Sequence, residues 1–449
     1  MQPQDRLPGD TYSLDARIQR HFAKLTTLGV QPDGSISRIA YSDAESSAIA
    51  YIRAEGEAFG LSSRYDAVGN LVLSLPGNQP RRLLVGSHLD SVPRGGNYDG
   101  SAGIVAGLEA LRDLTPEAED FEAGIDLVVW RGEEYTFDAV YKGSAAAFGV
   151  AETHILFNTY EHQTLRDAIR SQGFSPDCID DNRPTFSPQT IASIVGYYEL
   201  HIEQGVRLER ERKDLGIVTS IAGDRRYLIV LHGRFDHSGA TPMGRAFRND
   251  VNLTMAHIQT RADRLAEERR AQGHEFVQTV GVVNADPEVD RKYPDVHANS
   301  VTKVSGLGYF TLDIMGPDDD FLDTYSGEVH RLIWQTAKEF GVTANIEQTD
   351  RAGGVKALDA GLQQHLRQAI DSLGCSYLEL PSGAGHDAAL VAQVTRSDGS
   401  RIPVSMLFVP CRNGVSHSKE EYVAPEQMVK GTQALRDAMR TVALEGQTP

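Results

Sequence analysis

Apolar runs alternate with helix-like stretches through the first half of the chain. Residues 14–28 carry apolar side chains at helical spacing, and helical patterns recur at 101–114 and from 143 to 149. Three apolar runs are typical of buried strands: residues 82–88, 125–130 and 197–202. Strands separated by helices predict an α/β domain with a largely parallel or mixed sheet.

The pattern changes near residue 215. Strands are expected at 226–231 and 308–314, and long helices at 248–267 and 323–340. This order predicts a compact α+β domain over residues 219–345, inserted between a first segment (1–218) and a second (346–449) of the α/β domain. A helix at 362–373 and a strand at 404–409 return the chain to the first sheet.

Composition narrows the classes of partner. The 449 residues include 44 Lys and Arg against 62 Asp and Glu, a net charge of -18. This balance argues against a nucleic-acid partner and against docking on an anionic membrane. The N-terminus lacks a signal-like apolar region, no run is long enough to span a bilayer, and the three cysteines are scattered. We therefore expect a cytoplasmic protein with a small-molecule substrate.

The strongest local signal is GSHLD, in which His88 and Asp90 stand two apart at the end of a predicted strand. Side chains alternate along a strand, so both point to the same side. A carboxylate placed there can orient a metal-binding imidazole. The alternative is a pair that only hydrogen-bonds at a loop edge.

Two acidic motifs follow. Asp99 in GGNYDGS does not belong to a GxGxxG phosphate loop, and it could either bridge two metal ions or cap the next helix. Glu133 and Glu134 end the next apolar strand. One could bind metal while the other takes a proton from water, although a solvated charge pair is also possible.

Two further histidines stand at strand ends. His201 and Gln204 belong to HIEQG, and His417 belongs to VSHS. A buried structural histidine is the commoner interpretation of His201 taken alone. Together, however, five segments bring His, Asp or Glu to strand ends, where open α/β sheets bind ligands. Three histidines with carboxylates and no cysteine indicate zinc or another divalent metal in hydrolytic use, and the absence of HExxH excludes a helix-borne zinc site.

Seven motifs in order resemble one family. GSHLDSV, GNYDGSAGI, GEE, HIEQG, DHSGATPM, GAGHDA and GVSHS are similar to those of M20-type metallo-amidohydrolases, in the N-carbamoyl-L-amino acid hydrolase, allantoate amidohydrolase and β-ureidopropionase branch. The resemblance runs from about residue 14 to 440. It implies a di-metal peptidase-like catalytic domain with a mixed sheet, interrupted by a smaller α+β lid through which a homodimer forms. It also implies two divalent ions per subunit: zinc, or manganese, cobalt or nickel.

The same resemblance assigns roles to the strand-end residues. It implies two ligand groups that share one carboxylate: His88, Asp99 and His201 for one ion, and Asp99, Glu134 and His417 for the other. Asp90 would orient His88. Glu133 would be the general base that deprotonates the bridging water and then protonates the leaving nitrogen.

Substrate contacts are also implied. His237 in DHSGATPM resembles a catalytic histidine that reaches the neighbouring subunit's active site and helps to hold the oxyanion. Asn299 in HANSV resembles an asparagine that contacts the substrate carboxylate. Gln204, Gly385 and His386 would line the pocket, and a purely structural role for these three is equally open.

Two positions depart from the family pattern. Met315 stands where an arginine usually grips the substrate's α-carboxylate, and Asp224 stands where a glutamine is common. If both face the substrate, the pocket has lost a cation and gained an anion. We therefore hypothesise that the substrate lacks that carboxylate, or has a neutral or cationic group there. Arg291, Lys292 or Lys303 could instead supply a substitute cation.

These observations favour a metal-dependent amidohydrolase that cleaves a linear C–N amide or ureido bond of a small N-carbamoyl or ureido compound. An aminoacylase or dipeptidase-like M20 hydrolase is the alternative among enzymes. A non-catalytic binding protein on the same scaffold would have lost a metal-ligand residue or the general base. In this sequence all of the proposed metal ligands and the general base are present.

Overall fold

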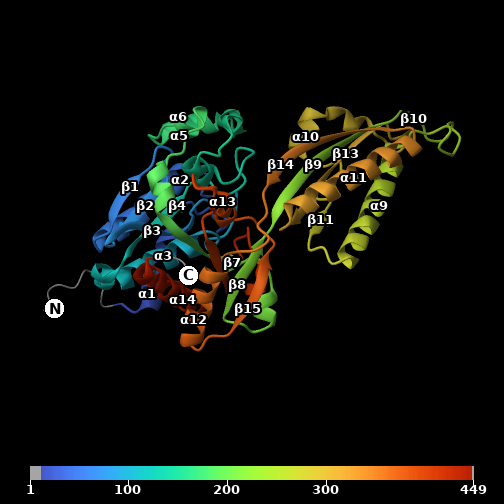
Figure 1. The fold of residues 1–449 in the computed structure, drawn as a ribbon. Coiled ribbons are helices and arrows are strands. Elements are labelled where there is room, and N and C mark those ends of the chain that lie inside the picture. The colour runs from blue at the N-terminus through green and yellow to red at the C-terminus, as the bar shows by residue number, and fades with distance from the viewer. Residues whose placement is uncertain (1–11, 447–449) are drawn as a thin grey trace. The chain divides into compact units, whose positions relative to one another are not determined.

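The computed structural model describes residues 12–446, and the chain divides into two compact units. Unit 1 combines the segment up to Ser220 with the segment from Ala357 onwards, and unit 2 is Ile221–Lys356. Figure 1 labels many of their helices and strands.

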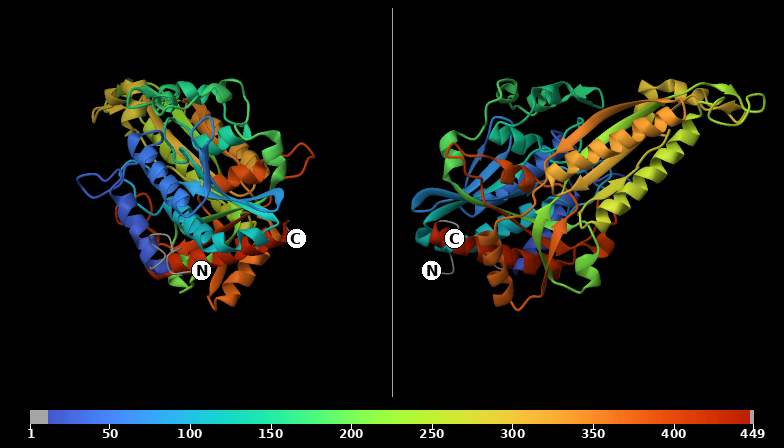
Figure 2. Two further views of the ribbon diagram at one scale, coloured as in Figure 1. Left: turned by 90° about the vertical axis from the view of Figure 1, so that its left-hand side faces the viewer. Right: turned by 45° about the vertical axis from the view of Figure 1, so that its right-hand side comes forward.

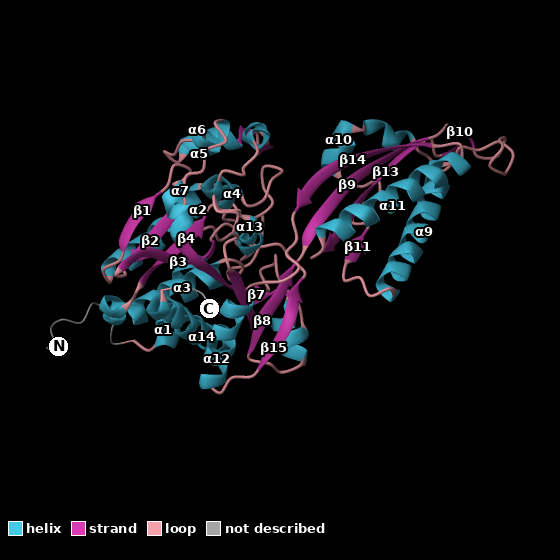
Figure 3. Ribbon diagram, in the orientation of Figure 1, coloured by secondary structure: helices cyan, strands magenta, loops and turns pink. Residues whose placement is uncertain are grey.

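Unit 1 is built on an eight-stranded mixed sheet (Figure 3). In spatial order its strands are β1 (Ser62–Tyr65), β2 (Leu71–Leu75), β4 (Ala123–Trp130), β3 (Gln79–His88), β7 (Ile194–Glu203), β16 (Val404–Pro410), β8 (Leu215–Ile221) and β15 (Tyr377–Ser382). Neighbouring strands among β4, β3, β7 and β16 are parallel, whereas β1 and β2 pair antiparallel with their neighbours and β8 pairs antiparallel with β16. The α/β class predicted from the sequence is thereby confirmed.

Helices lie on both faces of this sheet (Figure 2). One face shares a hydrophobic core with α1 (Leu14–Thr26), α2 (Asp43–Ala58), α3 (Ser101–Leu114), α12 (Ala360–Ser372) and α14 (Pro425–Glu445). On the other face Trp130 packs against Phe148 of α4, with ring centroids 6.0 Å apart. The shorter helices of unit 1 are α4 (Lys142–Phe148), α5 (Leu165–Ser171), α6 (Asp177–Asp180), α7 (Pro188–Ser193), α8 (Arg207–Arg210) and α13 (Asp387–Gln393).

Unit 2 has its own antiparallel sheet and its own core. The strands in spatial order are β11 (Val277–Thr279), β13 (Leu307–Gly316), β9 (Gly223–His232) and β14 (Thr343–Ala352). Two long helices, α9 (Val251–Ala271) and α11 (Asp319–Glu339), pack on one face through alternate strand residues such as Ile229 and Ile314. The remaining elements are the short α10 (Pro287–Lys292), a 3-10 helix (Pro294–Ala298), β10 (Asp236–His237) and β12 (Lys303–Val304).

The expected elements all form, with ends that differ by a few residues, but several others had no clear signal. The predicted domain end at residue 345 falls inside β14, which belongs to unit 2. This edge strand is mostly polar and exposed, so it lacks the apolar alternation that identifies a half-buried strand. Within residues 12–446, no helix is both long and apolar enough to cross a membrane.

Candidate metal centre

The four parallel strands of unit 1 bring chemically active side chains to one edge of the sheet. His88 is the last residue of β3, His201 lies near the end of β7, Glu134 follows β4, and His417 follows β16. Because parallel strands end at the same edge, these side chains converge. Asp99 joins them from the loop that precedes α3.

Two groups of ligand atoms result: His88, Asp99 and His201, and Asp99, Glu134 and His417. In each group the atoms lie within 4.8 Å of one another. Asp99 Oδ1 is 3.1 Å from His201 Nε2 and 3.6 Å from His88 Nε2. Its other oxygen, Oδ2, is 3.3 Å from His417 Nε2, which lies 3.5 Å from Glu134 Oε1. Asp99 therefore presents one oxygen to each group.

The donor set suits two divalent ions. All of its atoms are imidazole nitrogens or carboxylate oxygens, as zinc and similar metals prefer. Glu134 Oε1 is buried and accepts no hydrogen bond from any described residue. A buried carboxylate oxygen without a hydrogen bond is costly, and a cation bound at the second group would satisfy it.

Backbone carbonyls orient the two buried imidazoles. His88 Nδ1 lies 3.1 Å from the carbonyl oxygen of Asp90, and His201 Nδ1 lies 3.1 Å from that of Ile202. An Nδ1–H donated to a carbonyl leaves Nε2 as the acceptor, and His201 Nε2 accepts the backbone N–H of Gly100 at 3.3 Å. Both Nε2 atoms face Asp99, which is the arrangement that a metal ligand needs.

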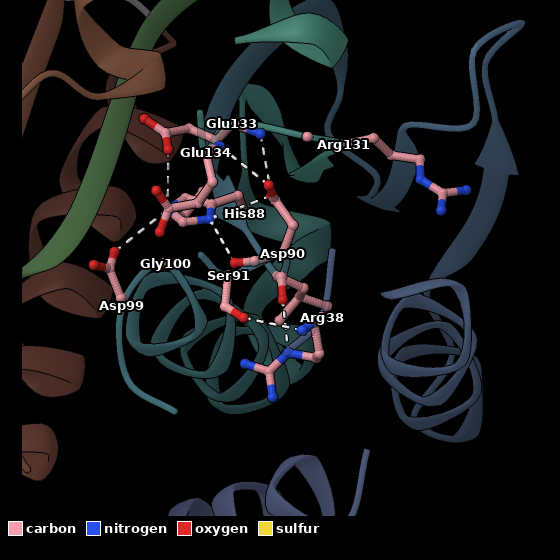
Figure 4. Close-up of polar contacts among 12 residues, drawn as sticks. Arg38, His88, Asp90, Ser91, Asp99, Gly100, Arg131, Glu133 and Glu134 are labelled. Carbon is pink, nitrogen blue, oxygen red and sulfur yellow. Dashed lines mark hydrogen bonds and ion pairs between the residues drawn. The ribbon is translucent and has the colours of Figure 1, made fainter. Parts of the chain in front are cut away.

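Asp90 ties the ends of β3 and β4 together (Figure 4). Its carboxylate accepts hydrogen bonds from the backbone N–H groups of Glu133 (3.1 Å) and Glu134 (3.0 Å). The same carboxylate lies 3.4 Å from His88 Nδ1. Asp90 thus contacts the imidazole, and it also fixes the backbone that carries both glutamates.

Glu133 lies beside the ligand groups without belonging to either. Its Oε2 is 3.7 Å from His88 Nε2, and the side chain is 12% exposed. Burial raises its pKa well above the usual value despite the nearby imidazole of His88, and Glu134 raises it further. A carboxyl with a raised pKa is suited to accept and return a proton.

The residues of the second ligand group have strongly shifted pKa values. Burial, with the charge of Asp99, raises the pKa of Glu134 to about 7. The hydrogen bond to Asp99 raises the pKa of His417 to about 9. Burial alone would raise the pKa of Asp99, but its contacts with three imidazoles hold that pKa well below the usual value.

Glycines and one buried ion pair shape the loops that carry these side chains. Gly100 has φ +62°, and a Cβ there would come within 2.5 Å of the His88 ring. Behind Glu133, Arg131 pairs with Glu45 at 2.6 Å, and both side chains are buried. Glu45 also accepts the N–H of Gly132 at 3.2 Å, so α2 anchors the turn after β4.

Two residues that the sequence did not single out support Asp99. Glu421 Oε1 accepts the backbone N–H groups of Tyr98 (2.6 Å) and Asp99 (3.0 Å). Ser416 donates to Asp99 Oδ2 at 2.8 Å and is 3.3 Å from Glu421 Oε2. Both lie within four residues of His417, but sequence proximity alone could not identify Asp99 as their partner.

Three residues expected in the pocket lie around the same site. Gln204 Nε2 donates to Asp99 Oδ2 at 2.9 Å. The ring of His386 lies 4.4 Å from that of His201, and its Nε2 is 2.8 Å from Ser382 Oγ. At Gly385 a Cβ would come within 1.9 Å of the Tyr141 hydroxyl, so a larger residue there would require Tyr141 to move.

The other expected substrate contacts belong to unit 2. His237 is exposed, and its Nδ1 accepts the N–H groups of Gly239 and Ala240. Asn299 donates to the Leu307 carbonyl at 2.9 Å, while its own side-chain oxygen is buried without a partner among the described residues. Asp224 and Met315 lie on neighbouring strands, β9 and β13.

An α/β sheet whose parallel strands gather histidines and carboxylates at one edge, with a separate α+β unit, defines a class of metal-dependent hydrolases. The chain belongs to the peptidase family M20/M25/M40, whose pattern it matches over residues 84–441. It is 33% identical to allantoate amidohydrolase of Bacillus subtilis (strain 168), a match that covers 96% of this chain and 98% of that protein.

Two further similarities point the same way. The chain is 30% identical to N-carbamoyl-L-amino-acid amidohydrolase of Paenarthrobacter aurescens, over 95% of this chain and 97% of that protein. The crystal structure of a hydantoinase/carbamoylase family amidase from Burkholderia multivorans is similar to the structure of this chain, with a TM-score of 0.80 and 28% sequence identity. That match covers 98% of this chain and 99% of the other.

Proposed function

We propose that this protein is a metal-dependent amidohydrolase that cleaves a linear C–N bond of a small N-carbamoyl or ureido compound. The observation that carries the proposal is Asp99, which offers one carboxylate oxygen to each of two ligand groups, with Glu133 beside them. Named relatives that match nearly the whole chain act on allantoate and on N-carbamoyl amino acids.

In this proposal, His88, Asp99 and His201 hold one ion, and Asp99, Glu134 and His417 hold the other. Divalent ions bound there would supply activation of water and polarisation of the scissile carbonyl. Glu133 takes the proton from the attacking water and returns it to the leaving nitrogen. Its raised pKa suits both steps, because the carboxyl can hold a proton between them.

Asp90 acts through its neighbours. By accepting the N–H groups of both glutamates, it keeps Glu133 and Glu134 at fixed positions relative to His88. Gln204 and His386 line the site, and His237 and Asn299 of unit 2 are proposed substrate contacts. We further propose that the ions are zinc, or manganese, cobalt or nickel, and that the protein is a cytoplasmic homodimer associated through unit 2.

A hydrolysis panel tests the proposal. Purified protein loaded with each metal in turn is given N-carbamoyl amino acids, allantoate, β-ureidopropionate, N-acyl amino acids and dipeptides, and released ammonia or amine is measured. Turnover of ureido or carbamoyl compounds above the others is expected. Preferential turnover of N-acyl amino acids or dipeptides would replace the proposal with an aminoacylase or peptidase.

No turnover with any metal, in protein that binds none, would favour a binding protein. Metal content is measured by mass spectrometry, and the molar mass by light scattering. Two ions per chain and the mass of a dimer are expected.

A further inference from the structure

Asp224 and Met315, which the resemblance described above marks as departures from the family pattern, lie directly opposite each other in the β9–β13 pair of unit 2. Two residues further along β9, on the same face of the sheet, Arg226 lies opposite Asp313. On the other side of β9, Asp350 of β14 also pairs with Arg226. Three adjacent strands (Figure 1) therefore place their polar side chains in one cluster, which we call the Asp224 cluster.

Within this cluster three carboxylates face one guanidinium. Arg226 is 2.8 Å from Asp350, 3.4 Å from Asp313 and 3.6 Å from Asp224. The neighbouring Arg225 points to the opposite face, where it pairs with two aspartates of α11 at 3.0 and 2.7 Å. Of the three carboxylates that face Arg226, Asp224 is the farthest from it.

Asp224 is the least satisfied member. It is 6% exposed, and its Oδ1 accepts no hydrogen bond from any described residue. The Oδ1 of Asp313 is also buried, and Arg226 Nε lies 3.4 Å from it. Burial, together with Asp350 and Asp313, raises the pKa of Asp224 to about 7 against the effect of Arg226. The backbone N–H of Ala352 and the guanidinium of Arg226 both act on this carboxylate, but its Oδ1 still has no donor, and a second cation would supply one.

The geometry favours an organic cation over a metal ion. Among the described residues, the groups whose ligand atoms converge closely enough for an ion both lie in unit 1. An ammonium or guanidinium group can instead donate hydrogen bonds to carboxylates that are farther apart. Met315 is partly exposed, unbranched and flexible, so it can move aside and contact an alkyl chain.

We propose that the Asp224 cluster binds the ammonium or guanidinium group of a small molecule, with Asp224 as its principal acceptor and Met315 against its alkyl chain. That this molecule is the substrate rests on the function proposed above. The substrate would then be a carbamoylated or ureido amine that carries a second, cationic group.

Binding is tested first, without hydrolysis. Isothermal titration or ligand-observed NMR on the full chain uses n-butylammonium as the probe and n-butanol as the neutral control. Binding of the ammonium alone is expected. Asp224→Asn should abolish it, whereas Asp323→Asn, which changes an aspartate on the opposite face of unit 2, should retain it. Equal binding by both variants would overturn the proposal.

Met315→Arg provides a second variant that removes no carboxylate. A guanidinium opposite Asp224 would occupy the cluster from within, so the ammonium probe should no longer bind. Thermal melting of each variant verifies that it is folded. If Met315→Arg binds the probe as tightly as the parent, Asp224 is not the acceptor.

Hydrolysis is tested with three ureas of equal chain length: 4-aminobutylurea, butylurea and 4-ureidobutyrate. The cationic compound should have a kcat/KM about tenfold or more above that of the neutral one, and Asp224→Asn should reduce this ratio. Asp323→Asn should leave the ratio as it is. A preference for the anionic compound would overturn the inference.

The two experiments separate the two proposals. If the probe binds in an Asp224-dependent manner but no urea is cleaved, the cation site stands and the proposed function fails. If ureas are cleaved without a preference for the cation and the probe does not bind, the function stands and the cation site fails.

Discussion

Among single residues, Glu133 and Glu134 are adjacent in sequence but differ in position. Only Glu134 contributes to a ligand group, whereas Glu133 faces His88 from outside both groups. We expect Glu133→Gln to lower kcat by about 10²–10⁴-fold, because the proton acceptor is lost, while metal content stays at the parent level. Glu134→Gln should lower metal content as well. Steady-state kinetics and metal analysis of both variants check this, and loss of metal from Glu133→Gln would contradict it.

Glu421 contributes through the backbone that it holds. Replacing it with alanine leaves the N–H groups of Tyr98 and Asp99 without their acceptor. We expect Glu421→Ala to weaken metal binding by about 10–100-fold, as loss of support behind a ligand typically does. Glu421→Gln keeps an acceptor oxygen and should have a smaller effect.

Glu420→Ala is the matched control for Glu421. This neighbour is exposed, and its side chain bonds to Ser418 rather than to the Asp99 loop. Competition against a chelator gives the metal affinity of each variant. Equal affinities for Glu421→Ala and Glu420→Ala would show that Glu421 does not support the site.

Asp224 makes the stability of the protein depend on pH. Its pKa rises from 3.8 to about 7 on folding, mainly through burial. The folded state therefore holds a proton that the unfolded state has released, and stability falls as pH rises from about 4 to 7. Asp224→Asn has no carboxyl to titrate at this position. Between pH 5 and pH 8, its free energy of unfolding should therefore rise by about 1–3 kcal/mol relative to that of the parent. Urea unfolding at both pH values measures the gain, and a difference independent of pH would refute it.

At the scale of elements, the junction between β3 and α3 requires glycine at position 100. Gly100→Ala adds left-handed strain and a Cβ within 2.5 Å of the His88 ring. We expect it to weaken metal binding by about tenfold or more by displacing His88. Gly60→Ala, also at positive φ but with nothing within 4 Å of its Cβ, should cost about 1 kcal/mol of stability and leave metal affinity unchanged. Equal metal affinities would contradict this account.

The elements also explain what the sequence could and could not predict. His88, His201 and the two glutamates follow apolar runs, so their place at a sheet edge could be inferred from local pattern alone. Asp224 and Met315 are opposite each other because of the β9–β13 register. A pairing between residues so distant in sequence depends on tertiary packing, and no local pattern encodes it. The support of Asp99 by Glu421 had no local signal for the same reason.

At the scale of the whole molecule, the two units have separate cores, and the proposed metal ligands all belong to unit 1. Metal removal should therefore destabilise unit 1 more than unit 2. Each unit contains one tryptophan: Trp130, fully buried in unit 1, and Trp334, half-exposed on α11. Trp334→Phe leaves Trp130 as the single reporter of unit 1.

We expect chelation to lower the melting temperature reported by Trp130 fluorescence by about 5–10 °C, since a ligand present at 100 times its Kd contributes about 2.7 kcal/mol. Zinc or manganese added back should restore it. The parent chain, in which Trp334 also contributes, should show a second component that chelation shifts less. The same test on Glu134→Gln controls for metal-independent effects of the chelator, because its weakened site should make Trp130 melting less sensitive to chelation. Chelation could shift the melting temperature equally with and without Glu134→Gln, or leave it unchanged where Glu134 is present. Either result would mean that the residues gathered around Asp99 do not hold the ions that stabilise unit 1.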